Sequence, residues 1–172
     1  MLGIPDRFIW ATDLLDNKPS YNVLEIGCGV GILAESIGNK LKTGHFLGVD
    51  KSEPMIDKAK KRNSKLIAKG LSSFLVSDFK NTNLPDDYFE IAVAFNVNFF
   101  KKNPTKELLQ IRKTLKSDSR LFVLYQDPYE TDLGAATPIK TKLIEGNFEI
   151  IDITIKKFTP TSAYCIESRP IL

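Results

Sequence analysis

Short apolar runs without interruption are the feature of this sequence that most constrains its fold. Five of them have the length of buried strands, at residues 21–26, 45–49, 73–76, 89–95 and 121–125. A strand that is apolar at nearly every position is typical of a parallel sheet covered on both faces. Because parallel neighbours need long crossover connections, we expect helices between these strands.

Helical patterns do lie between the runs. The first has apolar residues at the spacing of one helix face, namely Ile32, Leu33, Ile37 and Leu41. A second extends from a cap at Ser52 to a stop at Gly70, and a third begins after Asn103. Strands that alternate with helices predict βαβ units and a doubly wound α/β sheet with helices on both faces.

The order changes after residue 126. A helix is predicted around 139–145, and strand-like runs follow at 148–155 and 162–167. Their connection is too short for a parallel crossover of a dozen residues, so the pair should form an antiparallel hairpin. The whole is a mostly parallel, seven-stranded sheet with an antiparallel C-terminal hairpin. Without repeats or linkers, residues 1–172 should form a single domain.

Composition excludes several classes of protein. An apolar share of 42% beside 26% charged residues is that of an ordinary globular protein. No apolar run approaches the roughly 20 residues that span a bilayer, and the first residues lack the pattern of a secretion signal, so no membrane association is expected. Cys28 and Cys165 have neither metal-site nor disulfide spacing, which favours a cytoplasmic protein without a metal.

The net charge of +3 is small, but basic residues gather in one stretch, at Lys58, Lys60, Lys61, Arg62, Lys65 and Lys69. Because they alternate with apolar residues, we interpret them as the solvated face of an amphipathic helix. A nucleic-acid patch is the alternative, neither excluded nor otherwise indicated.

The segment 23–34 carries the most information about function. An apolar strand enters a turn with glycines at 27, 29 and 31, and this turn opens a helix. Glycines permit a tight turn and a close approach of the backbone to a ligand, beside the free N–H groups of the helix N-terminus. The G-x-G-x-x-G fingerprint of dinucleotide sites has a different spacing, so the segment does not favour NAD.

This segment resembles the first motif of the class I S-adenosylmethionine-dependent methyltransferases, an acidic residue followed by G-x-G-x-G between the first strand and the first helix. Glu25, Gly27, Gly29 and Gly31 match it, and Cys28 lies inside it. The resemblance implies a Rossmann-like enzyme that binds S-adenosylmethionine and releases S-adenosylhomocysteine. An ordinary strand-to-helix turn is the alternative for the motif alone.

A second element follows at the end of the next predicted strand. Asp50 stands about 20 residues beyond the glycine loop, where folds of this kind place an acid that accepts hydrogen bonds from ribose hydroxyls. A helix cap is the alternative for Asp50. The resemblance also assigns Lys51 and Met55 to the surroundings of the adenosine.

Two further elements extend the resemblance over about residues 21–167. After the third predicted strand it implies that Asp78 accepts from the adenine amino group and that the backbone of Phe79 contacts the ring, with a surface turn as the alternative. It places Asn96 beside the methionine part of the cofactor, with a strand cap as the alternative. The family's L-K-P-G-G turn is absent, since Lys116 is followed by Ser117 and Asp118.

The methyl acceptor is not indicated by any motif. His45 is predicted at the wrong end of the sheet for a catalytic base, so none is assigned. Residues expected near the acceptor are Asn96, Asn98, Tyr125 and Asp127, with Phe99 and Phe100 as walls. Residues 1–20 are expected to contain a helix that is either a lid or packing against the sheet.

The expected activity is methyl transfer to an unidentified acceptor, for which we favour a small molecule. Because the chain leaves little room for insertions, a surface supplied by a partner is also possible. Two alternatives are an RNA or protein methyltransferase that needs a partner, and a non-catalytic methyltransferase-like binding module. The glycines and Asp50 disfavour the module, because a chain that had lost the cofactor would be free to lose them. The oligomeric state is not indicated.

Overall fold

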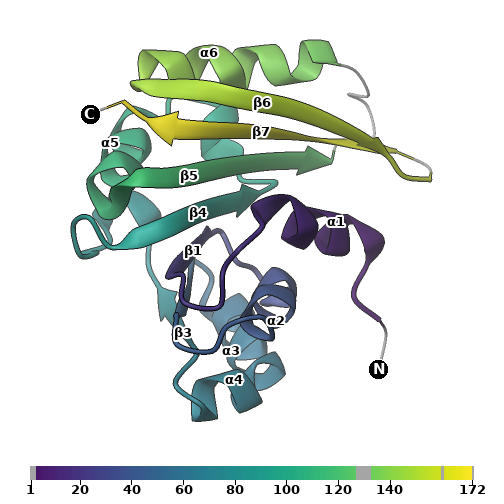
Figure 1. Ribbon diagram of the computed structural model, residues 1–172, viewed down its shortest axis with the longest axis vertical. Helices are drawn as coiled ribbons and strands as arrows, with labels where there is room; N and C mark the ends of the chain where they lie inside the picture. The colour runs from purple at the N-terminus through teal and green to yellow at the C-terminus, as the bar shows by residue number, and fades with distance from the viewer. Residues whose placement is uncertain (1–2, 127–132, 160, 172) are drawn as a thin grey trace. The chain divides into compact units, whose positions relative to one another are not determined.

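The computed structural model describes residues 3–126, 133–159 and 161–171 (Figure 1). The chain divides into two compact units, residues 1–83 and residues 84–172. Each unit contains part of the sheet together with the helices that follow its strands.

Three parallel strands form the sheet of the first unit, in the order β3-β2-β1. They are β1 (Val23–Ile26), β2 (Phe46–Asp50) and β3 (Ser72–Val76). Val23 lies opposite Phe46, and Phe46 lies opposite Ser72. The connections are α2 (Ile32–Gly38) after β1, and α3 (Glu53–Arg62) with α4 (Ser64–Ala68) after β2. Both are the long crossovers that parallel strands require.

Two further elements complete this unit. The helix α1 (Asp6–Leu15) precedes β1, and the short helix η1 (Phe79–Asn81) follows β3. The side chains that pack inside are fully buried and aliphatic or aromatic, among them Leu15, Leu24, Ile26, Leu33, Ile37, Phe46 and Ile56. The buried faces of α2 and α3 therefore follow from their apolar periodicity.

Four strands form the sheet of the second unit, in the order β4-β5-β7-β6. They are β4 (Phe89–Phe95), β5 (Leu115–Gln126), β6 (Phe148–Lys157) and β7 (Ser162–Pro170). The connecting helices are η2 (Asn98–Lys101), α5 (Thr105–Thr114), η3 (Leu133–Ala136) and α6 (Thr137–Glu145). β4 and β5 are parallel, whereas β7 is antiparallel to both β5 and β6. The predicted C-terminal hairpin is thus confirmed.

Some predicted boundaries were wrong. β1 begins at Val23, two residues after the predicted start, and β5 begins at Leu115, six residues before its predicted start at Leu121. Leu115 is fully buried opposite Phe89, and the register shifts before Ile91 meets Arg120. A bulge of this kind lets the strand start early although the intervening residues are polar.

The helix predicted between Ser52 and Gly70 is interrupted. It ends at Arg62, and α4 begins at Ser64. The Nδ2 of Asn63 donates to the carbonyl oxygen of Ala59, which also accepts from the backbone N–H of Asn63. A side chain that bonds to the backbone in this way competes with the regular helix, which explains the break. None of the helices in the described part of the chain could span a membrane.

Candidate cofactor site

The turn between β1 and α2 places its glycines in the left-handed region of φ. Gly27, Gly29 and Gly31 have φ angles of 71°, 52° and 70°. The backbone N–H groups of Gly27 and Cys28 donate to the carbonyl oxygen of Val49, at 2.8 and 3.1 Å. The turn therefore lies against the carboxyl end of β2, the edge at which open α/β sheets bind their ligands.

Gly29 and Gly31 are required for different reasons. A Cβ atom on Gly31 would lie 2.6 Å from the Nδ2 of Asn63 and 2.9 Å from the Cβ of Ala59. A Cβ atom on Gly29 would have no heavy atom within 4 Å. Gly31 thus permits close packing of the turn against α3, while the space at Gly29 is open to a ligand.

Asp50 joins the ends of β1 and β2. Its Oδ2 accepts from the backbone N–H of Gly29 at 2.9 Å, and its Oδ1 accepts from the backbone N–H of Ser52 at 2.9 Å. The carboxylate is half-buried, and each of its oxygens has a second lone pair with which to accept from a ligand. The N-cap residue of α3 is Ser52, whose side chain makes no capping bond, and Asp50 accepts from the backbone N–H of that residue.

Glu25 is a buried carboxyl group on β1. Its side chain is 3% exposed, and its buried Oε2 has no hydrogen-bond partner among the described residues. Burial raises the pKa of Glu25 well above its usual value, and the nearby charge of Asp50 raises it further. The folded chain therefore favours the protonated form, which could donate a hydrogen bond as well as accept one.

Cys28 cannot act as a nucleophile in this environment. It is 5% exposed, and a Cβ atom on Gly48 would lie 2.9 Å from its sulfur. Burial raises the pKa of the Cys28 thiol, and the charges of Glu25 and Asp50 raise it further. Since the thiolate is the reactive form, Cys28 contributes packing within the turn. The described residues contain no cluster of His, Cys, Asp and Glu that could hold a metal ion.

The other candidates in the first unit are less constrained. Lys51 and Met55 are exposed, on the turn after β2 and on the first turn of α3. Asp78 is exposed and pairs with Lys80 at 3.2 Å, whereas Phe79 is 5% exposed. The chain after β3 is fixed beside β2, because the N–H of residue 77 donates to the carbonyl oxygen of residue 50 at 2.9 Å.

Asn96 lies in the second unit, directly after β4. It has a φ of 56°, and its Oδ1 accepts from the backbone N–H of Gln126 at 2.9 Å. Its own N–H donates to the carbonyl oxygen of Leu124. Asn96 therefore ends β4 and ties it to β5, as the strand-cap alternative expects, while its contact with a cofactor stays a prediction.

The remaining candidates near the acceptor lie in the same unit. The Tyr125 hydroxyl donates to the carbonyl oxygen of Val97, and its ring stacks on Tyr164 with 5.8 Å between centroids. Asn98 is exposed, Phe99 is half-buried, and Phe100 is fully buried. Phe100 is therefore part of the core, and Asp127 lies outside the described residues.

His45 has a structural role in the first unit. Its Nδ1 lies 3.0 Å from the carbonyl oxygen of Gly70, and its Nε2 lies 2.7 Å from the Oγ of Ser73. Both ring nitrogens are thus used at the amino end of β2, away from the glycine turn.

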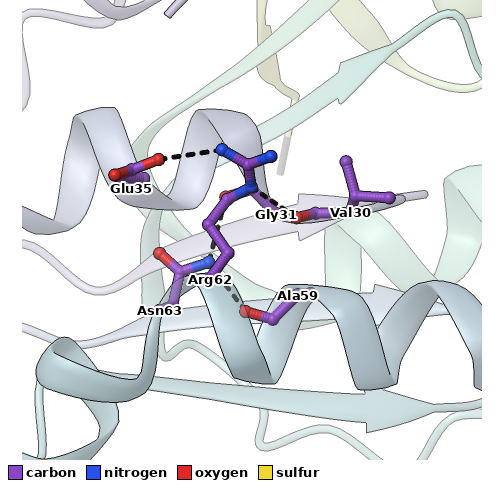
Figure 2. A network of polar contacts seen from close by, with 6 residues as sticks. All are labelled: Val30, Gly31, Glu35, Ala59, Arg62 and Asn63. Atoms are coloured by element: carbon purple, nitrogen blue, oxygen red, sulfur yellow. Dashed lines mark hydrogen bonds and ion pairs between the residues drawn. The ribbon is translucent and has the colours of Figure 1, made fainter. Parts of the chain in front are cut away.

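Sequence reasoning did not identify two residues that support the turn, Arg62 and Asn63 (Figure 2). The Nε of Arg62 donates to the carbonyl oxygen of Val30 at 3.1 Å, and the Nδ2 of Asn63 donates to that of Gly31 at 3.0 Å. Arg62 had been grouped with the exposed basic face. The available signal was Asn63 itself, a poor helix former inside a predicted helix.

Residues 23–118 match the family of methyltransferase domains. Along 169 residues the chain is 26% identical to the methyltransferase YdaC of Bacillus subtilis, covering 93% of this chain and 89% of YdaC. Along 111 residues it is 33% identical to the ubiquinone/menaquinone biosynthesis C-methyltransferase UbiE of Paraburkholderia phymatum, covering 62% of this chain and 44% of UbiE. The chain thus spans less than half the length of UbiE.

Solved structures agree with this assignment. A methyltransferase from Aquifex aeolicus that depends on S-adenosylmethionine has a TM-score of 0.79 at 17% identity, covering 95% of this chain and 89% of that one. Magnesium protoporphyrin IX methyltransferase from Synechocystis, solved with bound S-adenosylmethionine, has a TM-score of 0.75 at 17% identity. The likeness covers 96% of this chain and 79% of that one. These likenesses confirm the doubly wound α/β fold. With the match over more than half of its length, the chain belongs to the methyltransferase domain family and is a class I, S-adenosylmethionine-dependent methyltransferase.

Proposed function

We propose that the turn between β1 and α2, together with Asp50, holds S-adenosylmethionine for transfer of its methyl group to a small molecule. The observation that carries this proposal is the hydrogen bond between the Asp50 carboxylate and the N–H of Gly29. It brings a carboxylate that could accept from a diol beside Gly29, where a Cβ atom would meet no heavy atom within 4 Å. The unpartnered Oε2 of Glu25 adds a buried polar atom in need of a partner.

Each predicted residue has a proposed role in holding the cofactor. Asp50 would accept from the ribose hydroxyls, and Gly29 would let the backbone come close to the ligand. The surroundings of the adenosine would comprise Lys51, Met55, Asp78 and Phe79, and Glu25, Gly27, Cys28 and Gly31 would form the turn that receives the cofactor. For Asn96, the resemblance implies a place beside the methionine part. When bound, the cofactor supplies a methyl group on a sulfonium, which a nucleophile takes by in-line displacement.

The chain's own contribution is to bind, align and exclude water, so no obligatory catalytic residue is assigned. A small-molecule acceptor is supported by the relatives' names, which include a ubiquinone/menaquinone biosynthesis enzyme, a magnesium protoporphyrin IX enzyme and a geranyl diphosphate methyltransferase. A reducing, cytoplasmic location is part of the proposal, because Cys28 and Cys165 are buried, unpaired thiols.

Calorimetric titration with S-adenosylmethionine, S-adenosylhomocysteine and NAD in parallel tests the site. We expect micromolar binding of the two adenosyl ligands and no binding of NAD, followed by formation of S-adenosylhomocysteine with a small-molecule acceptor in a screen. Binding of NAD alone would contradict the assignment of the turn. Binding of neither would mean that the chain needs a partner or is a non-catalytic module.

A further inference from the structure

The end of α3 contacts the glycine turn through two adjacent side chains, Arg62 and Asn63 (Figure 2). They donate to the consecutive carbonyl oxygens of Val30 and Gly31, at 3.1 and 3.0 Å. Neither side chain was assigned to the cofactor, and both belong to the helix that follows Asp50 in the chain.

Asn63 is the buried member of this pair. It is 2% exposed, and its Nδ2 donates to both Gly31 and Ala59, at 3.0 Å each. The other donor to the Gly31 carbonyl is the N–H of Glu35, at the longer distance of 3.3 Å. Loss of the Asn63 amide would therefore leave the Gly31 carbonyl with only this weaker donor. Because the site is buried, an acceptor that lacks a hydrogen bond there destabilises the fold.

Arg62 is the exposed member of the pair and makes polar contacts with both the turn and α2. Its Nη1 lies 3.2 Å from the Oε2 of Glu35, and these side chains are 38% and 32% exposed. Ion pairs at such exposure contribute little to stability. The bond from Nε to the Val30 carbonyl is therefore the contact through which Arg62 acts on the turn.

These contacts determine where the backbone N–H groups of the turn point. In a trans peptide group the C=O and N–H are fixed in one plane and point in opposite directions. With the Gly31 carbonyl held towards α3, the N–H of Ile32 points away from α3. That N–H belongs to the first turn of α2, whose amide hydrogens are available to a ligand.

We propose that Arg62 and Asn63 are positioning residues for the cofactor. They do not touch it, but they hold the turn in the conformation in which its open side receives the ligand. This inference rests on the proposed cofactor site, since it concerns the affinity of that site. It also accounts for Gly31, because a side chain there would displace Asn63.

The test compares S-adenosylhomocysteine affinity and stability in matched variants. Asn63→Leu removes the donor and keeps the number of side-chain heavy atoms, and Arg62→Met removes the donor to Val30 at an exposed position. Glu35→Gln removes the charge of the ion pair but keeps the Arg62 contact with the turn. Leu66→Ala is the stability control, because Leu66 is buried on α4 against Gly38 and contacts neither carbonyl.

We expect dissociation constants about tenfold higher for Asn63→Leu and about threefold higher for Arg62→Met. Glu35→Gln and Leu66→Ala should stay within about twofold of the unaltered chain, although Leu66→Ala loses stability. Amide hydrogen exchange over residues 29–32 should be faster in Asn63→Leu than in the unaltered chain. In Leu66→Ala it should be unchanged once the loss of global stability is taken into account.

Two results would overturn the inference. If the unaltered chain binds S-adenosylhomocysteine and Arg62→Met and Asn63→Leu bind it equally well, the positioning role is wrong while the cofactor site stands. If Asn63→Leu does not fold, the exposed Arg62→Met variant decides in the same way. If the unaltered chain does not bind, the proposed cofactor site fails and the inference fails with it.

Discussion

Asp50 is the residue on which most of the cofactor site depends. Its carboxylate accepts from two backbone N–H groups and is still accessible enough to accept from a ligand. Sequence spacing predicted its position, and the structure adds that it holds the glycine turn. Its role in binding a ligand stays a prediction, while its two bonds to backbone N–H groups are structural.

Asp50→Ala should weaken S-adenosylhomocysteine binding by about 1–3 kcal/mol, the cost of losing a charged hydrogen bond to the ribose. Calorimetry measures this change, with Asp57→Ala as the control because Asp57 is an exposed acid on the neighbouring helix α3. Unchanged affinity in Asp50→Ala would show that Asp50 does not bind the ribose.

Glu25 should make stability depend on pH. Its folded-state pKa is raised by burial and by Asp50 above the ordinary value of 4.5, so the folded chain binds this proton more tightly than the unfolded chain. The contribution to stability is complete below the ordinary pKa and is lost as the pH rises through the raised one. Glu25→Gln has no such proton to lose.

The free energy of unfolding of Glu25→Gln should therefore increase relative to the unaltered chain as the pH rises above the ordinary pKa of 4.5. Urea unfolding of both proteins across this range gives the difference. Parallel curves would mean that Glu25 is ionised in the folded chain as readily as in the unfolded one.

At the scale of elements, α1 packs against α2 within the first unit. Trp10, Ala11 and Leu15 are buried, and the Oγ1 of Thr12, which donates to the carbonyl oxygen of Phe8, lies within hydrogen-bond distance of the Oγ of Ser36, at 2.9 Å. The sequence left open whether this helix is a lid or packs against the sheet. The packing it makes is against a helix, and a lid role stays a prediction.

Leu15→Ala should lower the free energy of unfolding by about 2–5 kcal/mol, because Leu15 is fully buried and the truncation leaves a cavity. Ile9→Ala on the same helix is the control, since Ile9 is 45% exposed and should cost much less. Urea unfolding decides between the two. Equal small effects would show that α1 adds little to the core.

The C-terminal hairpin and the break after α3 show what element prediction depends on. The hairpin was predictable because a short connection permits only an antiparallel pair, whatever else surrounds it. The break at Asn63 was not, since the Nδ2 of Asn63 donates both to the nearby carbonyl of Ala59 and to that of Gly31, more than thirty positions earlier in the chain. Helix propensity alone indicated that Asn63 is a poor helix former, but not that the helix ends before it and a second helix begins after it.

For the whole molecule, charge separates the small-molecule hypothesis from the RNA alternative. The basic residues of α3 and α4 are exposed, as a solvated face predicts, but the net charge is only +3. RNA binding through such a face would release counterions and would weaken steeply with salt.

We expect weak RNA binding of this non-specific kind, in the range of about 10⁻⁴–10⁻⁶ M, and methyl transfer to a small acceptor that does not need RNA. Fluorescence anisotropy with labelled RNA at low and physiological salt measures the first, and S-adenosylhomocysteine release measures the second. Tight, saturable RNA binding that stimulates release would favour the macromolecular acceptor.

The sequence by itself determined the fold class, the order of strands along the chain and the positions of the glycine turn and Asp50. These depend on local patterns, because periodicity, turn residues and connection length act over a few neighbouring residues. Only the tertiary structure decided that Asp50 bonds to Gly29, that Gly31 is needed for packing on α3, and that Arg62 and Asn63 support the turn. The reason is physical: each of these depends on a distance between segments far apart in the chain, and no local propensity encodes such a distance.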